Sequence, residues 1–237
     1  MEVGDLISEF RTVTGDHGTP PLWDDKSLIR WANEGQREAA IRAKLLRDFT
    51  TASVASIALI PGQRVYRLHP SVFDVDAVSM TRVLGTQDPD PCRRKLDYAG
   101  WCGTEDVVSG RERTGWANTF TLYDDASGDG FTGISIVLDR VPSADYGGTL
   151  NLSVYRLPLE DLEFKTDEPE IAQQHQIKLV NWILYRAYSV RDAEMQDLRR
   201  AADHKALFTA DFGEMPDANV RRKQRRHRAV RCRPERW

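Results

Sequence analysis

Two overlapping stretches near the middle of the chain place glycines and acids at spacings that bind phosphates or calcium in other proteins. Residues 128–133 match G-x-G-x-x-G, which binds a dinucleotide when a strand precedes it and a helix follows it. Here residues 134–141 follow, and they are typical of a strand, so we predict a glycine-rich hairpin turn. Residues 125–130 resemble the start of a calcium loop, but Ile136 stands where that loop requires a glutamate. We therefore predict an acidic turn in solvent.

The five histidines and the acidic pairs do not form a recognisable catalytic or metal-binding motif. No histidine stands in H-E-x-x-H or beside a cysteine at ligand spacing, and neither G-x-S-x-G nor a P-loop occurs. Glu160 with Asp161, or Glu168 with Glu170, could cleave a glycoside only if their carboxylates faced each other at the required separation. We interpret them as surface acids and predict no catalytic residue, no metal and no cofactor.

Charge is unevenly distributed along the chain, although the net formal charge is only −3. Residues 219–237 contain nine Lys or Arg and one acid, a net of +8. The other 218 residues carry 24 basic and 35 acidic side chains, a net of −11. An acidic body with a basic tail indicates two different partners, or a tail that docks on an acidic surface.

The basic tail has three interpretations that its residues leave open. It can be a disordered, solubilising end, because so many like charges with so few apolar residues cannot form a core. It can be an arginine-rich arm that binds nucleic acid. It can also be an extension that folds onto a protein partner, and Trp237 favours this interpretation because a terminal tryptophan is a good buried anchor.

The remaining composition indicates a cytosolic origin and no membrane. Three scattered cysteines, none in a C-x-x-C pair, do not form a disulfide framework. Residues 1–10 lack the basic and apolar regions of a signal peptide. The most apolar stretch, residues 177–188, is interrupted by Lys178, Asn181 and Arg186, so it is not a membrane span.

Helical periodicity is clearest toward the N-terminus. Residues 3–14 form a short amphipathic helix. Residues 22–48 form the clearest helix, with Asp24 as its N-cap and with Gly35 and Ala39 in its apolar stripe. Small residues in such a stripe allow another helix to approach closely.

Helical periodicity returns near the C-terminus. Residues 171–190 predict a helix of about 30 Å that is apolar on two sides, which we interpret as packing against its own domain and against a second subunit. Asp192 is expected to cap a last helix that ends at Gly213. Its expected apolar face consists of Met195, Leu198, Ala202, Leu207 and Phe208.

The period between these helices is that of strands. Residues 50–68 predict two strands joined by a turn at Pro61 and Gly62, and another strand is expected to begin near Asp74. Residues 85–115 are expected to form loops with one short helix near Trp101. Later strands are expected at residues 118–125, 133–141 and 149–159. Five or six short strands favour a compact antiparallel sheet, sandwich or barrel.

The predicted fold class is therefore α+β, with a helical bundle domain formed by N- and C-terminal helices, an inserted antiparallel β domain and an extended basic C-terminal tail. We assign the helical domain to residues 1–49 and 158–213, the β domain to residues 50–157, and the extension to residues 214–237.

Two stretches resemble a known family. Residues 22–48, with Asn-Glu-Gly-Gln-Arg-Glu at 33–38, resemble the first long helix of the head-to-tail adaptor proteins of podoviruses. Residues 154–162 and 169–195 resemble the closing strand and return helix of the same family. The order of helix, β insertion, helix pair and extended C-terminus also fits.

The resemblance implies a structural virion protein that is assembled in the host cytoplasm. Such adaptors form a homo-oligomer, most often a ring of twelve copies. The ring docks on the portal protein, meets the tail nozzle or a tail-fibre protein, and lets double-stranded DNA pass without specific binding. The resemblance also leaves two alternatives: an adaptor with peptidoglycan-cleaving (muramidase) activity, and a nucleic-acid-binding protein that uses its arginine-rich arm.

The residues expected at these contacts follow from the tail and from the apolar helices. The portal-binding residues are expected to be Arg221, Arg222, Lys223, Arg225, Arg226, Arg228, Arg231, Arg233 and Trp237. The subunit interface is expected to use Trp31, Ala39, Leu46, Leu179, Trp182 and Tyr185.

Overall fold

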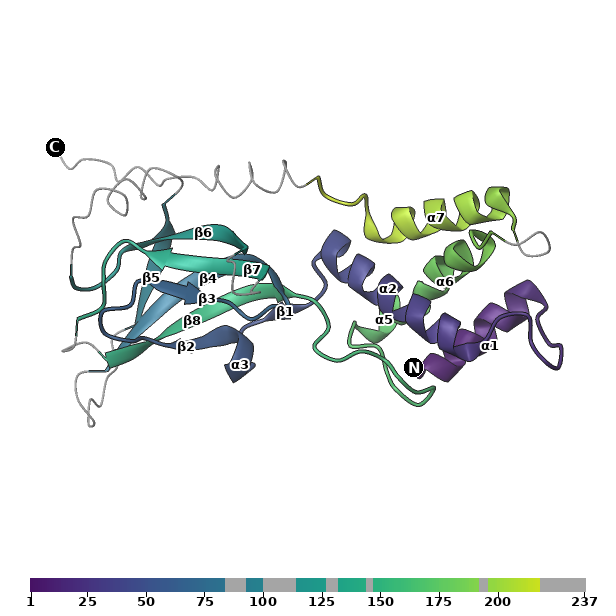
Figure 1. Ribbon diagram of the computed structural model, residues 1–237, viewed down its shortest axis with the longest axis horizontal. Coiled ribbons are helices and arrows are strands. Elements are labelled where there is room, and N and C mark those ends of the chain that lie inside the picture. Colours follow the sequence, from purple (N-terminus) through teal and green to yellow (C-terminus); the bar gives the residue numbers. More distant parts are fainter. Residues whose placement is uncertain (84–92, 100–113, 127–131, 144–146, 192–195, 218–237) are drawn as a thin grey trace. The chain divides into compact units, whose positions relative to one another are not determined.

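The computed structural model describes residues 1–83, 93–99, 114–126, 132–143, 147–191 and 196–217 (Figure 1). The chain divides into a helical unit, Met1–Leu46 with Arg156–Met215, and a β unit that contains Arg47–Tyr155. The predicted α+β class is confirmed. No helix among the described residues is long and apolar enough to cross a membrane.

The helical unit is built from both ends of the chain. Its helices are α1 (Val3–Thr14), α2 (Asp25–Ala43), α5 (Gln173–Gln176), α6 (Leu179–Tyr188) and α7 (Leu198–Phe212). The prediction for α1 is confirmed, and so is the N-cap of α2, where the Asp24 carboxylate accepts the Ser27 N–H at 3.1 Å. A hydrogen bond with the Ser27 side chain is the main cause of the lowered pKa of Asp24, and the bond from the Ser27 N–H adds to it.

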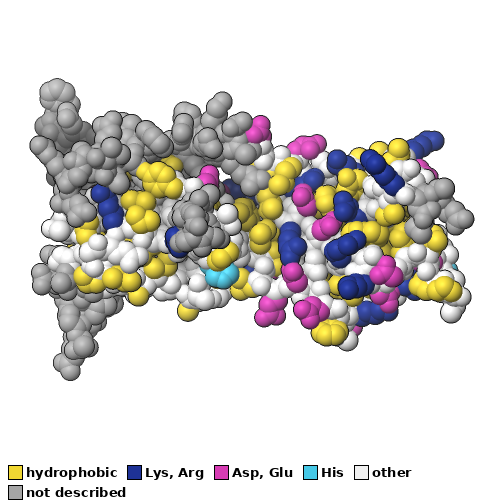
Figure 2. Space-filling model, in the orientation of Figure 1, with side chains coloured by type: hydrophobic (Ala, Val, Ile, Leu, Met, Phe, Trp, Pro, Cys, Tyr) yellow, Lys and Arg dark blue, Asp and Glu magenta, His cyan; other side chains and the backbone are white. Residues whose placement is uncertain are grey.

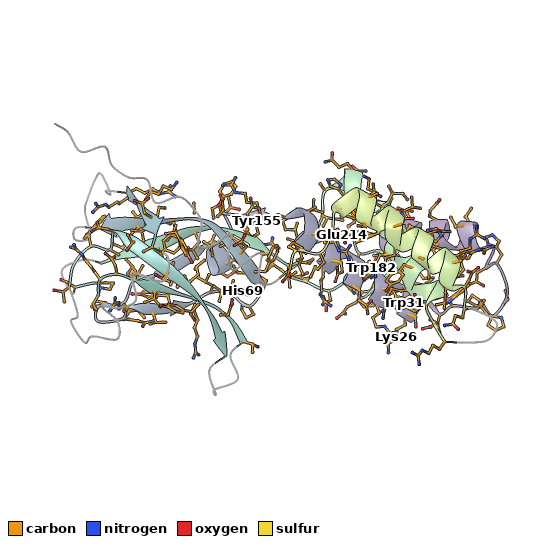
Figure 3. The ribbon with its side chains drawn as sticks, turned by 90° about the horizontal axis from the view of Figure 1, so that it is seen from above. Lys26, Trp31, His69, Tyr155, Trp182 and Glu214 are labelled. Carbon is orange, nitrogen blue, oxygen red and sulfur yellow. The ribbon has the colours of Figure 1, made fainter. Side chains whose placement is uncertain are left out.

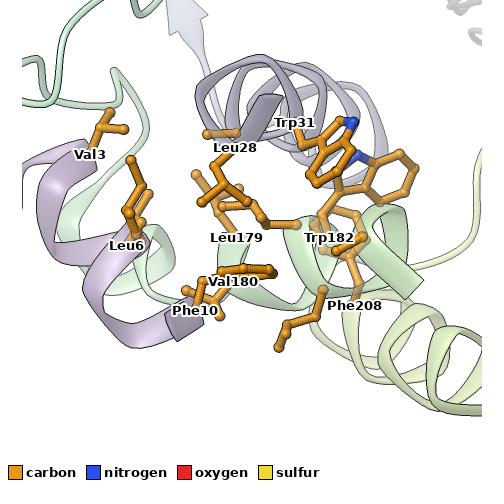
Figure 4. Close-up of a cluster of buried hydrophobic side chains, with 14 of the residues drawn as sticks. Val3, Leu6, Phe10, Leu28, Trp31, Leu179, Val180, Trp182 and Phe208 are labelled. Atoms are coloured by element: carbon orange, nitrogen blue, oxygen red, sulfur yellow. The ribbon is translucent and has the colours of Figure 1, made fainter. Parts of the chain in front are cut away.

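Helix α6 lies at the centre of the helical unit. Seven of its ten residues are buried, and it packs against α1, α2 and α7. Figure 4 shows side chains from all four helices meeting in one core that includes Phe10, Leu28, Leu179 and Phe208. The two apolar sides of α6 are therefore covered by helices of its own unit, so the apolar pattern of this helix does not require the second subunit by which we interpreted it.

Helices α2 and α6 approach each other closely at Gly35 of α2. A Cβ atom added there would lie 3.1 Å from each of three atoms of Trp182 on α6. On α7, the Phe208 ring packs against the Trp182 ring, with the two ring centroids 4.9 Å apart. The expectation that the small residues of α2 admit another helix is confirmed at this point, because a side chain at residue 35 would force the Trp182 side chain to move away.

The predicted long helix over residues 171–190 is wrong in its length. Two shorter helices, α5 and α6, are separated at Ile177 and Lys178, and the N–H groups of Lys178, Val180 and Asn181 each bond the carbonyl three residues back. This tighter turn is of the 3₁₀ type, which commonly interrupts or ends an α-helix. Before α5, the Glu170 N–H and the Ile171 carbonyl bond to the side chains of Gln36 and Gln176 and not to a helix backbone. The periodic pattern therefore overestimates the length of the helix.

Helix α7 ends as predicted but buries a different face. Gly213 follows it with φ of 83°, and the Gly213 N–H donates to the Thr209 carbonyl at 2.8 Å. Ala201, Phe208 and Phe212 are buried. Leu198 and Leu207 are 66% and 52% exposed, so their expected place on the apolar face is wrong. Asp197 caps the helix, whereas the expected cap, Asp192, lies outside the described residues with Met195.

The β unit is one curled, mixed sheet. Its strands are β1 (Arg47–Asp48), β2 (Ser56–Ala58), β3 (Val65–Arg67), β4 (Val72–Val83), β5 (Arg93–Tyr98), β6 (Thr119–Ala126), β7 (Thr132–Leu138) and β8 (Gly147–Arg156). The order is β1-β8-β4-β5-β6-β7-β3, with β2 paired to β8. One turn of helix, α3 (Ala52–Ala55), precedes β2.

Several expectations for the sheet need correction. The two strands predicted over residues 50–68 exist as β2 and β3, but β2 pairs with β8 and β3 with β7, so they do not form a hairpin. β5 falls in the stretch expected to be loop, because only Leu96 is buried in a run of charged residues. β5 and β6 are parallel, so the sheet is not wholly antiparallel. Trp101 lies outside the described residues.

The close contact at Gly35 generates a stability prediction. Gly35→Ala should lower the free energy of unfolding by about 1–3 kcal/mol because the methyl group overpacks against Trp182. Helix propensity alone predicts a gain of about 1 kcal/mol. Urea unfolding measures the sign.

The matched control is the same substitution in a Trp182→Ala background. There two of the three close atoms, Cγ and Cδ1 of residue 182, are gone and only its Cβ remains, so Gly35→Ala should cost clearly less than in the parent. An equal loss in both backgrounds would contradict the contact.

Candidate interaction surface

The residues at 33–38 hold a long connection against α2. This connection, residues 157–172, joins β8 to α5 and is called the return segment below. Asn33 binds it as a two-point clamp: Asn33 Nδ2 donates to the Leu162 carbonyl at 2.8 Å, and the Leu162 N–H donates to Asn33 Oδ1 at 2.9 Å. Both hydrogen bonds are buried, so water cannot replace either partner.

Gln36 makes a second attachment one turn farther along α2. Its Oε1 accepts the Glu170 N–H at 2.6 Å, and Gln36 is only 1% exposed. The Glu170 carboxylate pairs with Arg156 and accepts the Leu159 N–H at 3.0 Å. Glu170 thereby ties the beginning and the end of the return segment together.

The other residues of 33–38 also have defined contacts. Glu34 pairs with Arg186 of α6 at 2.9 Å, and Arg37 pairs with Asp161 of the return segment. Glu38 pairs with Arg42, whose guanidinium lies over the Trp182 ring at 5.5 Å. With Gly35 against Trp182, residues 33–37 each join α2 to another part of the helical unit, and Glu38 contacts Arg42, which does the same.

The middle of the return segment is a tight acidic turn. Asp167 Oδ2 accepts the N–H groups of Phe164 and Glu163 at 2.8 Å, and these bonds hold the Asp167 pKa below its usual range. The carbonyls of Lys165 and Asp167 accept the first N–H groups of α1. The turn therefore caps α1 and is itself rigidly shaped.

The return segment borders an open cavity of about 860 Å³. Six of the ten lining residues are acids: Glu160, Asp161, Glu163, Asp167, Glu168 and Glu170. Phe164 and Leu159, which also line the cavity, are 65% and 41% exposed. Figure 2 shows acidic and basic side chains interspersed over the helical unit. An acidic, partly apolar hollow on a rigid turn is suited to binding a basic partner.

A comparison with known families decides what kind of protein carries this surface. A family model described as the SU10 adaptor protein matches residues 1–233. The chain belongs to the SU10 adaptor family. No curated protein matches it. The resemblance to phage head-to-tail adaptors is thereby confirmed, and the adaptor is a structural component of a bacteriophage virion that interacts with other virion components.

The predicted interface residues of the adaptor lie in or beside the core of its helical unit. Trp31, Ala39, Leu179 and Trp182 are at most 8% exposed, while Leu46 and Tyr185 are partly buried against the same core. Figure 3 shows Trp31 and Trp182 within the helical unit. Their contact with a second subunit stays a prediction, but the four buried residues have little surface left for it.

The other predicted sites divide between described and undescribed residues. The predicted portal-binding residues, Arg221 to Trp237, lie outside the described residues, as does most of the glycine-rich stretch at 128–133. Its neighbours β6 and β7 pair as antiparallel strands, with Ala126 opposite Thr132, so the stretch connects two strands as predicted. Among the described residues, no group of His, Cys, Asp or Glu is arranged to hold a metal ion.

One titratable cluster joins α6 to α7. The His204 ring stacks on Tyr188 at 6.0 Å, and its Nδ1 lies 3.1 Å from Asn181 Oδ1. That carbonyl oxygen only accepts, so Nδ1 carries the hydrogen in the neutral ring. Burial lowers the pKa of His204; the Asp203 charge opposes this shift and the Arg200 charge adds to it.

The Asn33 clamp generates a second prediction. Asn33→Ala leaves the N–H and C=O of Leu162 without partners, at a cost of about 1–3 kcal/mol for each buried group. Hydrogen exchange should speed up at Leu162 and Glu163, and the free energy of unfolding should fall. Arg37→Ala is the control, because its exposed pair with Asp161 is worth at most about 1 kcal/mol. Equal opening of the segment in both variants would disprove the clamp.

The His204 cluster generates a pH prediction. The folded state disfavours protonation, so this group contributes full stability above its unfolded pKa of about 6.5 and loses it as the pH falls toward the lower folded pKa. Melting temperatures between neutral and mildly acidic pH should fall less in His204→Gln than in the parent. The same acid slope in both proteins would exclude His204 as its source.

Proposed function

We propose that the adaptor forms a ring of twelve copies between the portal and the tail of the virion, and meets the tail nozzle or a tail-fibre protein on its other side. Family membership over residues 1–233 carries this proposal. The helical unit would form the wall of the ring. Leu46 and Tyr185 are the predicted interface residues that keep exposed surface for a neighbouring copy.

We assign portal docking to the basic C-terminal segment. Residues 219–237 carry a net charge of +8, and eight of the nine basic side chains are arginines. A guanidinium binds a carboxylate with two parallel hydrogen bonds, which an ammonium group cannot do. Trp237 would add a buried anchor at the end of the segment.

The remaining body would let DNA pass without holding it. Its net charge of −11, repeated around a ring, repels phosphate groups along the channel. We also propose that the adaptor has no catalytic activity. A muramidase needs a carboxylic acid whose pKa is raised. Asp24 and Asp167 have displaced pKa values, and both shift downward.

Portal loading tests the proposed function. Full-length adaptor should load onto purified portal rings, and native mass spectrometry should count twelve copies. Deletion of residues 219–237 should leave the cooperative unfolding transition unchanged and reduce portal binding at least tenfold, because the arginine contacts are lost. Loading of the truncated chain at the parent's affinity in moderate salt would disprove the docking role.

The proposed inertness of the body has its own measurement. A chain ending at Asp217 should not retard duplex DNA at physiological salt and should not clear peptidoglycan in a zymogram. Tight duplex binding with a steep salt dependence would favour the nucleic-acid-binding alternative. Clearing that one carboxylate substitution abolishes would favour the muramidase.

A further inference from the structure

The acidic cavity beside the return segment contains charge that the described structure does not neutralise. Asp161 pairs with Arg37, and Glu170 pairs with Arg156. Glu168 lies 3.6 Å from the terminal amine of Met1 but is 66% exposed. Glu160 and Glu163 have no hydrogen-bonded or ionic partner for their side chains among the described residues. Several carboxylates therefore face the cavity with little or no compensation.

A buried amide group also faces this cavity. Gln36 is 99% removed from solvent yet lines the cavity, and its Oε1 is occupied by the Glu170 N–H. Its Nε2 has no hydrogen-bond partner among the described residues. The Nε2 group is not fully shielded from solvent, so a ligand oxygen in the cavity can accept its hydrogen bond.

These two features together select a basic peptide. A metal ion requires oxygen ligands around one point, whereas the described acids form no such group and the buried group is a donor. An extended peptide offers main-chain carbonyls to Gln36 and spaced cationic side chains to the carboxylates. Phe164 and Leu159 at the rim offer exposed apolar surface for its uncharged residues.

We propose that this cavity binds the arginine-rich segment 219–237 of a second copy of the adaptor. The segment is the strongly basic stretch of this chain, with nine cationic side chains in nineteen residues, interspersed with Val220, Val230 and Trp237. Its guanidinium groups pair with Glu160 and Glu163, one of its carbonyls accepts from Gln36, and an apolar residue covers Phe164. Each copy then offers one segment and one cavity, so the contact is head-to-tail and can propagate from copy to copy.

This contact belongs to the adaptor before it meets a portal. One segment cannot occupy the cavity and the portal at the same time, so portal carboxylates would displace it. The contact can be tested without any portal, and its failure would leave the proposed portal docking untouched.

The test uses the full-length adaptor as an equal mixture of ¹⁵N-labelled and unlabelled chains in low salt. Lys223 is the one lysine of the segment. A zero-length carbodiimide reagent should join Lys223 to Glu160, Glu163 or Glu168. The cross-linked pairs should include mixed ones, in which one peptide is ¹⁵N-labelled and the other is unlabelled. Sedimentation velocity should show salt-sensitive self-association of the same protein.

Charge-matched variants identify the surface. The triple variant E160Q, E163Q, E168Q should weaken self-association about tenfold, because each exposed ion pair contributes a fraction of a kcal/mol to about 1 kcal/mol. The control triple, E9Q, D203N, E214Q, removes the same charge from exposed acids outside the cavity and should change nothing. Cross-links found only between two labelled or two unlabelled peptides, cross-links to other acids only, or equal weakening in both triples would overturn the proposal.

Discussion

The helical unit depends on the approach of α2 to α6 at Gly35. With no side chain at this position, the Trp182 indole lies directly on the α2 backbone and reaches Phe208 of α7. Arg42 then lies over both rings and bonds to Thr209 and to the Gly213 carbonyl, where α7 ends. Three helices from opposite ends of the chain are thus held by one aromatic residue, and packing at this density does not tolerate an added methyl group without rearrangement.

The turn of α2 that admits α6 also carries polar groups for the return segment. Asn33 and Gln36 flank Gly35, and each satisfies backbone groups that would otherwise be buried without partners. The apolar and polar contacts are interleaved within one turn of helix, so a shift of α6 and a loosening of the return segment are not independent events. An acidic turn can therefore be presented on a long connection while its shape stays fixed.

Local features of this adaptor were predictable from the sequence, and contacts between distant residues were not. The Asp24 cap, the amphipathic face of α1 and the glycine after α7 depend on neighbours a few residues away. The clamp between Asn33 and Leu162 joins residues 129 positions apart, so no periodicity reveals it. The apolar pattern of residues 171–190 predicts burial on two sides. It does not reveal that the covering helices, α1, α2 and α7, all come from the same chain. The buried face of α7 was predicted wrongly because both leucines of the helix, Leu198 and Leu207, are exposed, whereas Ala201, Phe208 and Phe212 are buried.

The β unit begins and ends at one point. The Arg156 N–H donates to the Leu46 carbonyl at 3.0 Å, and the next residues, Arg47 and Tyr155, face each other in the pairing of β1 with β8. Because the two ends are already in contact, joining them directly would require only a short loop with a small closure entropy. Recombination between phage genomes could therefore exchange the β unit as a whole for one of another length with other surface loops. The helices before and after it would keep their contacts with one another.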